Sequence, residues 1–208
     1  MTDSVIVVIG DIVSSRKITD RVAFDNGLLR TLEELNARNA DILSPYTLTI
    51  GDEIQAVFGR ADSLFHDAVS ILAAIHPEKM RFSWGLGRLT KPINPKRAIG
   101  MDGPAFHVAR DGVEELKESG YLFNVSGEGI PNLSLLRETL SLISHTMTKW
   151  PRTRFQTLAM MQEGNSVKEV AARLDLSDQA VYKTIDAGAL DVVTQLFNET
   201  QAILNSRR

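Results

Sequence analysis

The sequence of 208 residues contains no cysteine, and this absence excludes disulfides, thiolate nucleophiles and cysteine zinc sites. Its 4 histidines show none of the spacings typical of metal ligands. Long apolar runs are also missing. The run at residues 5–9 is too short for a signal peptide, and no stretch approaches the length of a membrane span. We therefore expect a cytoplasmic protein that does not enter a membrane.

The sequence also lacks a strong excess of charge of one sign. The net charge is −3 at pH 7, so the molecule as a whole has no electrostatic signature of a nucleic-acid-binding protein. The first 140 residues carry a net charge of −4, and residues 141–208 carry +1. This asymmetry permits a DNA-contacting C-terminal part but favours it only mildly. The apolar fraction of 43% is typical of a folded globular protein.

Hydrophobic patterns predict alternating strands and helices in the first 126 residues. The β-branched run at 5–9 is typical of a strand buried on both faces. Gly85 and Gly87 lie in a later strand, where glycine usually marks close approach by another backbone or a ligand. The first six elements have the order of a ferredoxin-like βαββαβ unit. The predicted strands are 5–9, 46–50, 54–58, 81–89 and 121–125, and the predicted helices are 18–40, 62–75 and 104–119.

Turn residues at 127–131 mark a predicted domain boundary, after which the pattern is helical. We predict an α+β protein with a ferredoxin-like α/β domain over 1–130 and a small all-α domain over 131–208. The predicted helices of the second domain are 134–147, 151–163, 166–174 and 178–204. The last of them carries an apolar stripe suited to pairing two subunits, formed by Leu190, Val193, Leu196, Phe197 and Ile203.

Residues 167–186 have the pattern of a helix-turn-helix. Ser166, with Glu169 three residues later, predicts a capping box, and Ser177 predicts the N-cap of the second helix. Ala171 is small where the two helices must cross. Apolar residues stand where the helices must pack: Val170, Leu174, Leu176 and Val181. The alternative is a three-helix bundle that packs against the first domain or another subunit without contacting DNA.

The second helix of such a motif enters the major groove of DNA. Gln179 is suited to adenine edges and Lys183 to guanine, whereas Arg154 and the basic residues of the first helix are suited to phosphates. The predicted recognition helix also contains Asp178 and Asp186, so its contribution to non-specific binding is small. The candidate DNA contacts are Lys168, Arg173, Ser177, Gln179, Tyr182 and Lys183.

Acidic residues follow two predicted strands of the first domain. Asp11 ends the first strand, and Asp52 lies in a Gly-Asp hairpin turn with Glu53 beside it. These strands are neighbours in a βαββαβ sheet, and converging carboxylates suit Mg²⁺ or Mn²⁺ with phosphate oxygens. The alternative is turn and capping chemistry, for which Asp is equally common. The candidate nucleotide or phosphate contacts in the next loop are Ser14, Ser15 and Arg16.

Three segments resemble the SatD family: Gly10-Asp-Ile-Val-Ser-Ser-Arg16, Thr49-Ile-Gly-Asp-Glu-Ile-Gln55 and Arg97-Ala-Ile-Gly-Met-Asp-Gly-Pro-Ala-Phe-His-Val-Ala-Arg110. The resemblance covers nearly the whole chain, and its most specific part is residues 98–107. It implies little about activity. The first domain, over about residues 4–126, is also similar to class III nucleotide cyclases and more distantly to GGDEF domains.

The cyclase similarity implies metal-binding roles for Asp11 and Asp52. It also implies a homodimer, because such domains pair to build their active site. The sequence departs from the cyclase pattern at Leu48, where ATP-using cyclases have Lys, and at Asp111, where they have Arg.

Two further positions bear on catalysis. His107 replaces the transition-state Asn of the cyclases, and Arg110 lies one position from the expected Arg, so these two are only candidate catalytic residues. We interpret His107 as lining a ligand pocket, with core packing as its alternative. Trp84 and Trp150 are interpreted as core or interdomain packing.

These patterns favour a DNA-binding transcriptional regulator whose first domain senses a nucleotide or phosphorylated ligand, with Mg²⁺ or Mn²⁺ as its metal. One alternative is a metal-dependent nucleotidyl or phosphoryl transferase. The other is a catalytically dead domain that only forms a dimer. An enzyme is the less favoured interpretation, because the base-recognition Lys and the transition-state Asn are absent.

Overall fold

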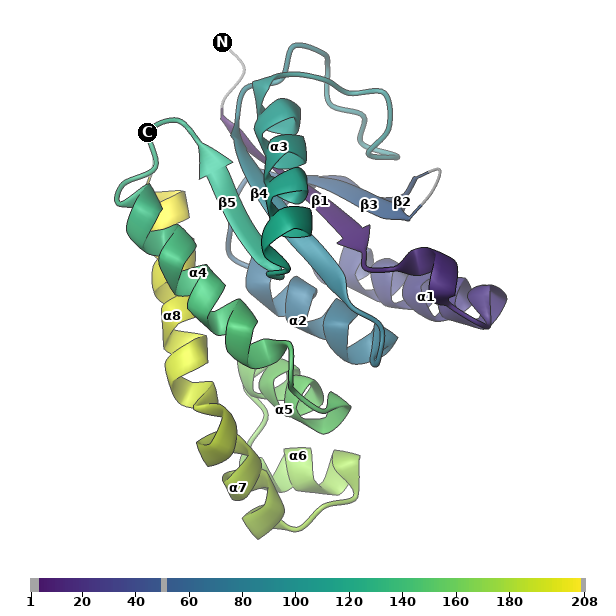
Figure 1. Ribbon diagram of the computed structural model, residues 1–208, viewed down its shortest axis with the longest axis vertical. Coiled ribbons are helices and arrows are strands. Elements are labelled where there is room, and N and C mark those ends of the chain that lie inside the picture. The colour runs from purple at the N-terminus through teal and green to yellow at the C-terminus, as the bar shows by residue number, and fades with distance from the viewer. Residues whose placement is uncertain (1–3, 50–51, 207–208) are drawn as a thin grey trace.

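The computed structural model describes residues 4–49 and 52–206. Within them lies a five-stranded sheet of order β2-β3-β1-β4-β5, flanked by helices (Figure 1). The central strand β1 (Val5–Ile12) is antiparallel to β3 (Glu53–Phe58) and β4 (Met80–Gly87). The edge strands are β2 (Ile42–Leu48), antiparallel to β3, and β5 (Phe123–Gly127), parallel to β4. The chain is therefore a mixed α+β protein.

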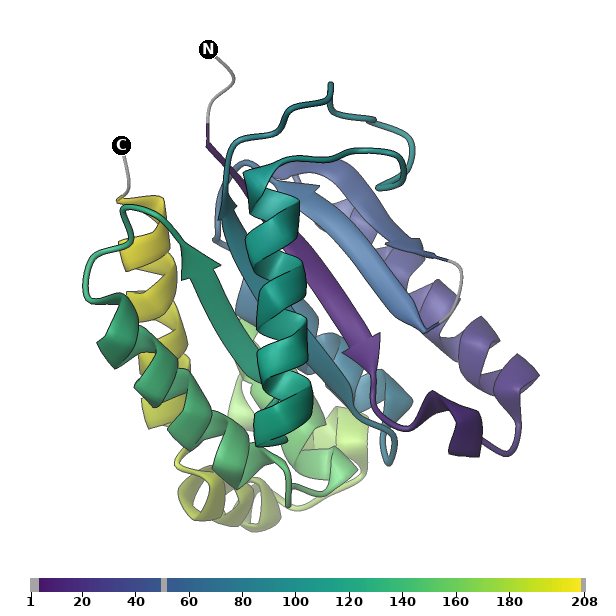
Figure 2. The same ribbon diagram turned by 45° about the horizontal axis from the view of Figure 1, so that its top comes forward.

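Strand β1 is buried on both faces, which confirms the expectation for its β-branched run. Ile6 and Val8 join the cluster under α1 (Arg21–Arg38) and α2 (Leu64–Ile75), whereas Val7 and Ile9 join a smaller cluster under α3 (Pro104–Ser119). Figure 2 shows α3 lying across one face of the sheet, with α1 and α2 behind it. The molecule thus has helices on both faces of the sheet.

The two glycines of β4 lie where α3 approaches the sheet most closely. A Cβ atom at Gly85 would stand 2.2 Å from the carbonyl oxygen of Ala105, and one at Gly87 would stand 3.1 Å from the nitrogen of Ala105. The expected close approach at these glycines is therefore confirmed, and the approaching group is the backbone of α3.

The C-terminal helices complete the core that the sheet begins. They are α4 (Leu133–Met147), α5 (Arg152–Gln162), α6 (Val167–Leu174), α7 (Asp178–Gly188) and α8 (Leu190–Asn205). Helix α4 packs on β5, and α5 packs on α2. One hydrophobic cluster includes Leu140 and Phe197 of these helices together with Phe65 and Trp84 of the α/β part. The boundary at residue 130 stays a prediction, and the two segments on either side of it share this core.

The predicted single helix at 178–204 is wrong. The segment forms α7 and α8, which are separated by Ala189 in the left-handed conformation, with φ 47° and ψ 44°. A residue in this conformation ends a helix, and the chain then starts α8 in a new direction.

At the other end of the chain, α1 begins at Arg21 rather than residue 18. Asp20 caps it by accepting a hydrogen bond from the Ala23 N–H at 2.9 Å.

The apolar stripe of α8 does not face outward, so its predicted role in pairing subunits is wrong. Leu190 and Phe197 are fully buried against the rest of the same chain. The Phe197 ring stacks on Phe65 with centroids 4.4 Å apart and an interplanar angle of 8°. Burial within the monomer leaves these side chains unavailable to a second copy.

None of the helices in the described residues is both long and apolar enough to cross a membrane.

Candidate functional site

Asp11 lies in a row of charged side chains across three strands. The strand register places it opposite Glu53 of β3 and opposite Arg81 of β4. Asp11 Oδ2 pairs with Arg81 Nη1 at 3.0 Å, and Lys117 Nζ of α3 lies 3.8 Å from Asp11 Oδ1. Glu53 accepts a hydrogen bond from Gln55 Nε2 at 2.5 Å and lies 3.4 Å from Arg110 Nη1. Two of the predicted metal ligands are therefore neighbours, and each has an arginine partner.

Asp52 faces a different set of partners at the N-terminal end of α1. Its Oδ1 accepts a hydrogen bond from Arg21 Nη1 at 2.6 Å, and its Oδ2 accepts one from the Ser15 hydroxyl. The Ser15 hydrogen bond and the Arg21 guanidinium, with the charge of Arg16 nearby, hold the pKa of Asp52 below its ordinary value. The structure thus brings Ser15 and Arg16 close to Asp52. Ser14, by contrast, has an exposed side chain and a left-handed backbone conformation with φ 54°.

These ion pairs bear on the Mg²⁺ or Mn²⁺ prediction. Arg81 and Arg21 already neutralise these carboxylates, so a cation at either aspartate would compete with an arginine. In the part of the chain that the structure describes, no group of three or more His, Asp or Glu side chains is arranged to hold a metal. Residue 51 of the Gly-Asp turn lies outside the described residues. The metal site stays a prediction.

The candidate catalytic residues of α3 lie on its exposed side. The His107 side chain is 67% exposed, so core packing is excluded as its role. Its Nε2 lies 2.9 Å from Asp102 Oδ1, and the Gly103 N–H and His107 lower the pKa of Asp102. Trp84 and Trp150, by contrast, are buried, which confirms their interpretation as packing residues.

Helices α6 and α7 occupy the predicted helix-turn-helix region and pack through Val170, Ala171 and Val181. Ser166 and Glu169 form the expected capping box, and the Ser177 hydroxyl accepts a hydrogen bond from the Ala180 N–H at 3.2 Å. The predicted caps are therefore confirmed.

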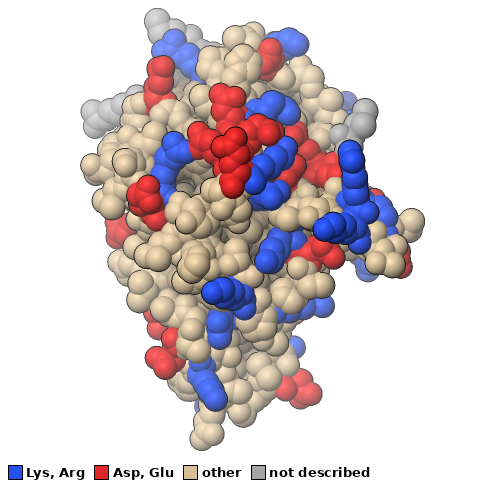
Figure 3. All heavy atoms as spheres, viewed as in Figure 1, with Lys and Arg blue, Asp and Glu red and all other residues tan. Residues whose placement is uncertain are grey.

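The candidate DNA contacts all lie on the surface of these helices. The Tyr182 residue is 61% exposed, and the other exposed candidates are Lys168, Arg173, Ser177, Gln179 and Lys183. Arg154 differs from them: its guanidinium lies 5.7 Å from the centroid of the Trp150 ring, and its Nε is buried. The Arg154 side chain is therefore half-buried beside Trp150, and its phosphate contact stays a prediction. Figure 3 shows basic side chains interspersed with acidic ones over the face it displays.

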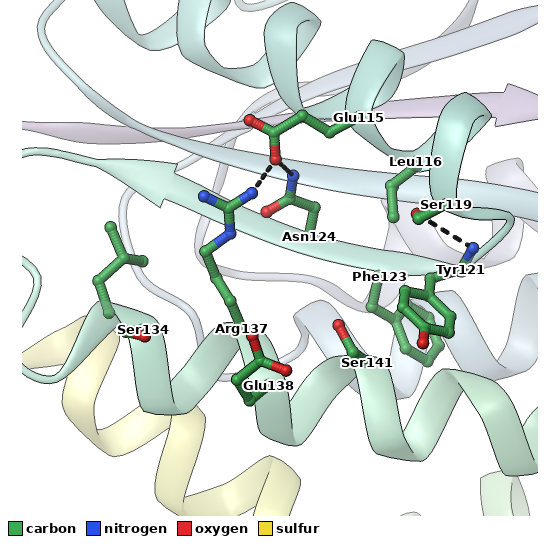
Figure 4. Close-up of a pocket in the computed structure, with 11 residues that line it drawn as sticks. Glu115, Leu116, Ser119, Tyr121, Phe123, Asn124, Ser134, Arg137, Glu138 and Ser141 are labelled. Carbon is green, nitrogen blue, oxygen red and sulfur yellow. Dashed lines mark hydrogen bonds and ion pairs between the residues drawn. The ribbon is translucent and has the colours of Figure 1, made fainter.

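Sequence reasoning missed a cavity between α3, β5 and α4, with a volume of about 410 Å³ (Figure 4). Its polar side chains include Glu115, Asn124 and Arg137. The sequence signal for this cavity is Asn124. It is a polar residue in a buried strand, with apolar Phe123 and Val125 on either side. Such a residue needs hydrogen-bond partners when the strand is buried.

Among known proteins, no curated one matches the chain. Among solved structures, the chain is similar to a bacterial light-regulated adenylyl cyclase, with 15% identity and a TM-score of 0.41. That similarity covers 61% of this chain and 44% of the cyclase chain, so it spans less than half of the cyclase. The SatD family model matches residues 5–204, and the chain belongs to the SatD family.

Proposed function

We propose that the protein is a DNA-binding transcriptional regulator in which α6 and α7 form a helix-turn-helix with α7 as the recognition helix. The observation that carries this proposal is the packing of two short, capped helices around Val170, Ala171 and Val181. The polar side chains Gln179 and Lys183 of α7 are exposed. Side chains at these positions of a recognition helix contact base edges.

The charge of this region predicts how binding depends on salt. Lys183 is the only basic residue of α7, and Asp178 and Asp186 lie on the same helix. Few phosphate contacts mean weak non-specific binding and a shallow dependence of affinity on salt. We therefore expect a homodimer to supply the remaining affinity through a second half-site, with the α/β segment as the pairing surface.

The proposal is tested by selecting DNA from a random-sequence pool at low salt and measuring binding to the selected sequence by fluorescence anisotropy. We expect Gln179→Ala and Lys183→Glu each to weaken binding by about tenfold or more, because each removes a base contact. Lys96→Glu makes the same charge change in an exposed loop between β4 and α3, and should leave affinity nearly unchanged. Failure to enrich any sequence at low salt would refute the proposal.

A second candidate function concerns the α/β segment. The strand order β2-β3-β1-β4 supports a ferredoxin-like, cyclase-related unit. Asp11 lies opposite Glu53, and Asp52 precedes Glu53 in the chain. These carboxylates support sensing, or less favourably turnover, of a nucleotide with Mg²⁺ or Mn²⁺. The test incubates the protein with Mn²⁺ and ATP or GTP, and follows both thermal stability and nucleotide products. Stabilisation that is lost in Asp11→Asn indicates sensing. New products indicate a transferase. If neither stabilisation nor new products are observed, dimerisation remains as the role of this segment.

A further inference from the structure

The cavity between α3, β5 and α4 joins the two halves of the chain. The end of α3 and strand β5 form one wall, and α4 forms the other (Figure 4). Leu116, Phe123 and Leu133 supply apolar surface, and the rim is polar. The volume of about 410 Å³ lies within the range of small-molecule sites. None of the residues proposed for DNA or metal binding lines it.

Asn124 lines this cavity and carries an unpaired acceptor. The residue is only 5% exposed, and its Nδ2 donates to Glu115 Oε2 at 2.9 Å and to the Gly112 carbonyl oxygen at 3.3 Å. Because both of these partners are acceptors, the amide cannot be reversed without losing both bonds. Its Oδ1 is buried and has no hydrogen-bond partner among the described residues. Figure 4 shows this oxygen turned away from Glu115, on the Arg137 side.

The charges of the lining favour a ligand with positive charge. Glu115 and Glu138 face one basic residue, Arg137, whose Nη2 already pairs with Glu115 Oε2. The Asn124 amide nitrogen is also occupied, which leaves Asn124 Oδ1 and the second oxygen of Glu115 as acceptors. A ligand that satisfies them must bring hydrogen-bond donors, and donors with positive charge form the stronger bonds to the carboxylate.

We propose that this cavity binds a small organic cation that carries several N–H groups on a short apolar body, such as an alkylguanidinium. Its N–H groups donate to Asn124 Oδ1 and to Glu115 Oε2, the oxygen that Arg137 holds in the structure, while its apolar body contacts Leu116 and Phe123. In the structure the guanidinium of Arg137 occupies one oxygen of Glu115, so the ligand competes with a side chain of the same chemical class. Binding therefore releases α4 from α3 at this ion pair.

The experiment uses the full chain and three probes with short alkyl bodies of three or four carbons and different head groups: butylguanidinium, butylurea and butyrate. Affinity is measured by calorimetry, and the site is identified from NMR shifts of the Asn124 side-chain amide. We expect butylguanidinium to bind in the millimolar range, with butylurea roughly tenfold weaker and butyrate not binding at about 10 mM. Equal binding of butylurea, preference for butyrate, or no binding of any probe overturns the proposal.

Variants then test the competition with Arg137. Glu115→Gln should weaken butylguanidinium binding roughly tenfold, whereas Arg137→Gln should strengthen it because the competing cation is gone. Glu118→Gln removes an exposed carboxylate of the same helix outside the cavity, and should change nothing. Circular dichroism establishes that each variant is folded. Weaker binding in Arg137→Gln, or unchanged binding in a folded Glu115→Gln, contradicts the inference.

Discussion

Single residues decide how closely helix and sheet approach one another in this protein. Gly85 allows the backbone of α3 to lie against β4, where a Cβ atom would also meet the Ala109 nitrogen at 2.7 Å. The neighbour is backbone rather than a flexible side chain, so it cannot move aside without displacing the helix. Single residues also set the charge of the predicted metal site, because Arg81 pairs with Asp11 and Arg21 pairs with Asp52.

Gly85→Ala should lower the free energy of unfolding by about 1–3 kcal/mol, because the added methyl group overpacks the contact with α3. Urea unfolding followed by circular dichroism measures this change. Gly27→Ala is the matched control: Gly27 lies inside α1 with nothing within 4 Å of its added Cβ. It should raise stability by about 0.5–1 kcal/mol, because Ala is the better helix former. Equal effects of the two substitutions would contradict the close-packing argument.

Asp52→Asn should reduce stability at neutral pH, because it removes the charge that Arg21 and Ser15 stabilise. The folded state lowers the pKa of Asp52, so its contribution is present above the unfolded value and is lost as pH falls through the folded value. The stability difference between wild type and variant should therefore shrink below about pH 4. Urea midpoints measured across the acid range check this. Asp186→Asn, at an exposed position, should change stability at neutral pH by less than about 0.5 kcal/mol.

At the scale of elements, the helical region depends on local end signals. The capping box at Ser166 starts α6, Ser177 starts α7, and Ala189 ends α7 in a left-handed conformation. This last feature separates α7 from α8, so the proposed recognition helix is short and ends where α8 enters the shared core. An apolar pattern alone predicted one continuous helix, because the periodicity passes through Ala189 without interruption.

Ala189→Gly should therefore stabilise the protein, by about 1 kcal/mol, because glycine adopts the left-handed conformation without the steric cost that Ala carries. The same change at Ala202, an exposed position inside α8, should destabilise by about 1 kcal/mol. Chemical unfolding of both variants measures the contrast. Destabilisation by Ala189→Gly would indicate that residue 189 does not adopt the left-handed conformation that separates α7 from α8.

At the scale of the whole molecule, the helical segment and the sheet share one hydrophobic cluster. The Phe197 ring of α8 stacks on Phe65 of α2 and contacts Phe123 of β5, with centroids 4.4 Å and 5.9 Å apart. The C-terminal helices therefore cover a surface that the α/β segment would otherwise expose. The cavity proposed to bind an organic cation lies at the same junction, between β5 and α4.

Phe197→Ala should lower the free energy of unfolding by about 3–5 kcal/mol. Because the α/β segment and the C-terminal helices share this cluster, both should unfold at the same lower urea concentration. Fluorescence of Trp84 in a Trp150→Phe background reports on the sheet, and circular dichroism reports mainly on the helices. The two signals should give one urea midpoint, shifted equally by Phe197→Ala. Val192→Ala, on the exposed side of α8, should cost less than about 0.5 kcal/mol. Two separate midpoints would instead indicate two independently folding domains.

Some features of this protein are determined by the sequence alone. The double burial of β1, the glycines of β4, and the caps at Ser166 and Ser177 were all predictable, because each depends on periodicity or on hydrogen bonds within a few residues. The membership of the SatD family also follows from the sequence.

Other features were decided only by tertiary structure. The pairing of Asp11 with Arg81 depends on strand register, and that of Asp52 with Arg21 depends on the packing of α1 against the hairpin. The apolar stripe of α8 could have faced a second subunit or the chain's own core, and the contact of Phe197 with Phe65 decided between them. The physical reason is common to all three: hydrophobicity and charge specify that a side chain needs a partner, but only the folded chain brings a particular partner within reach.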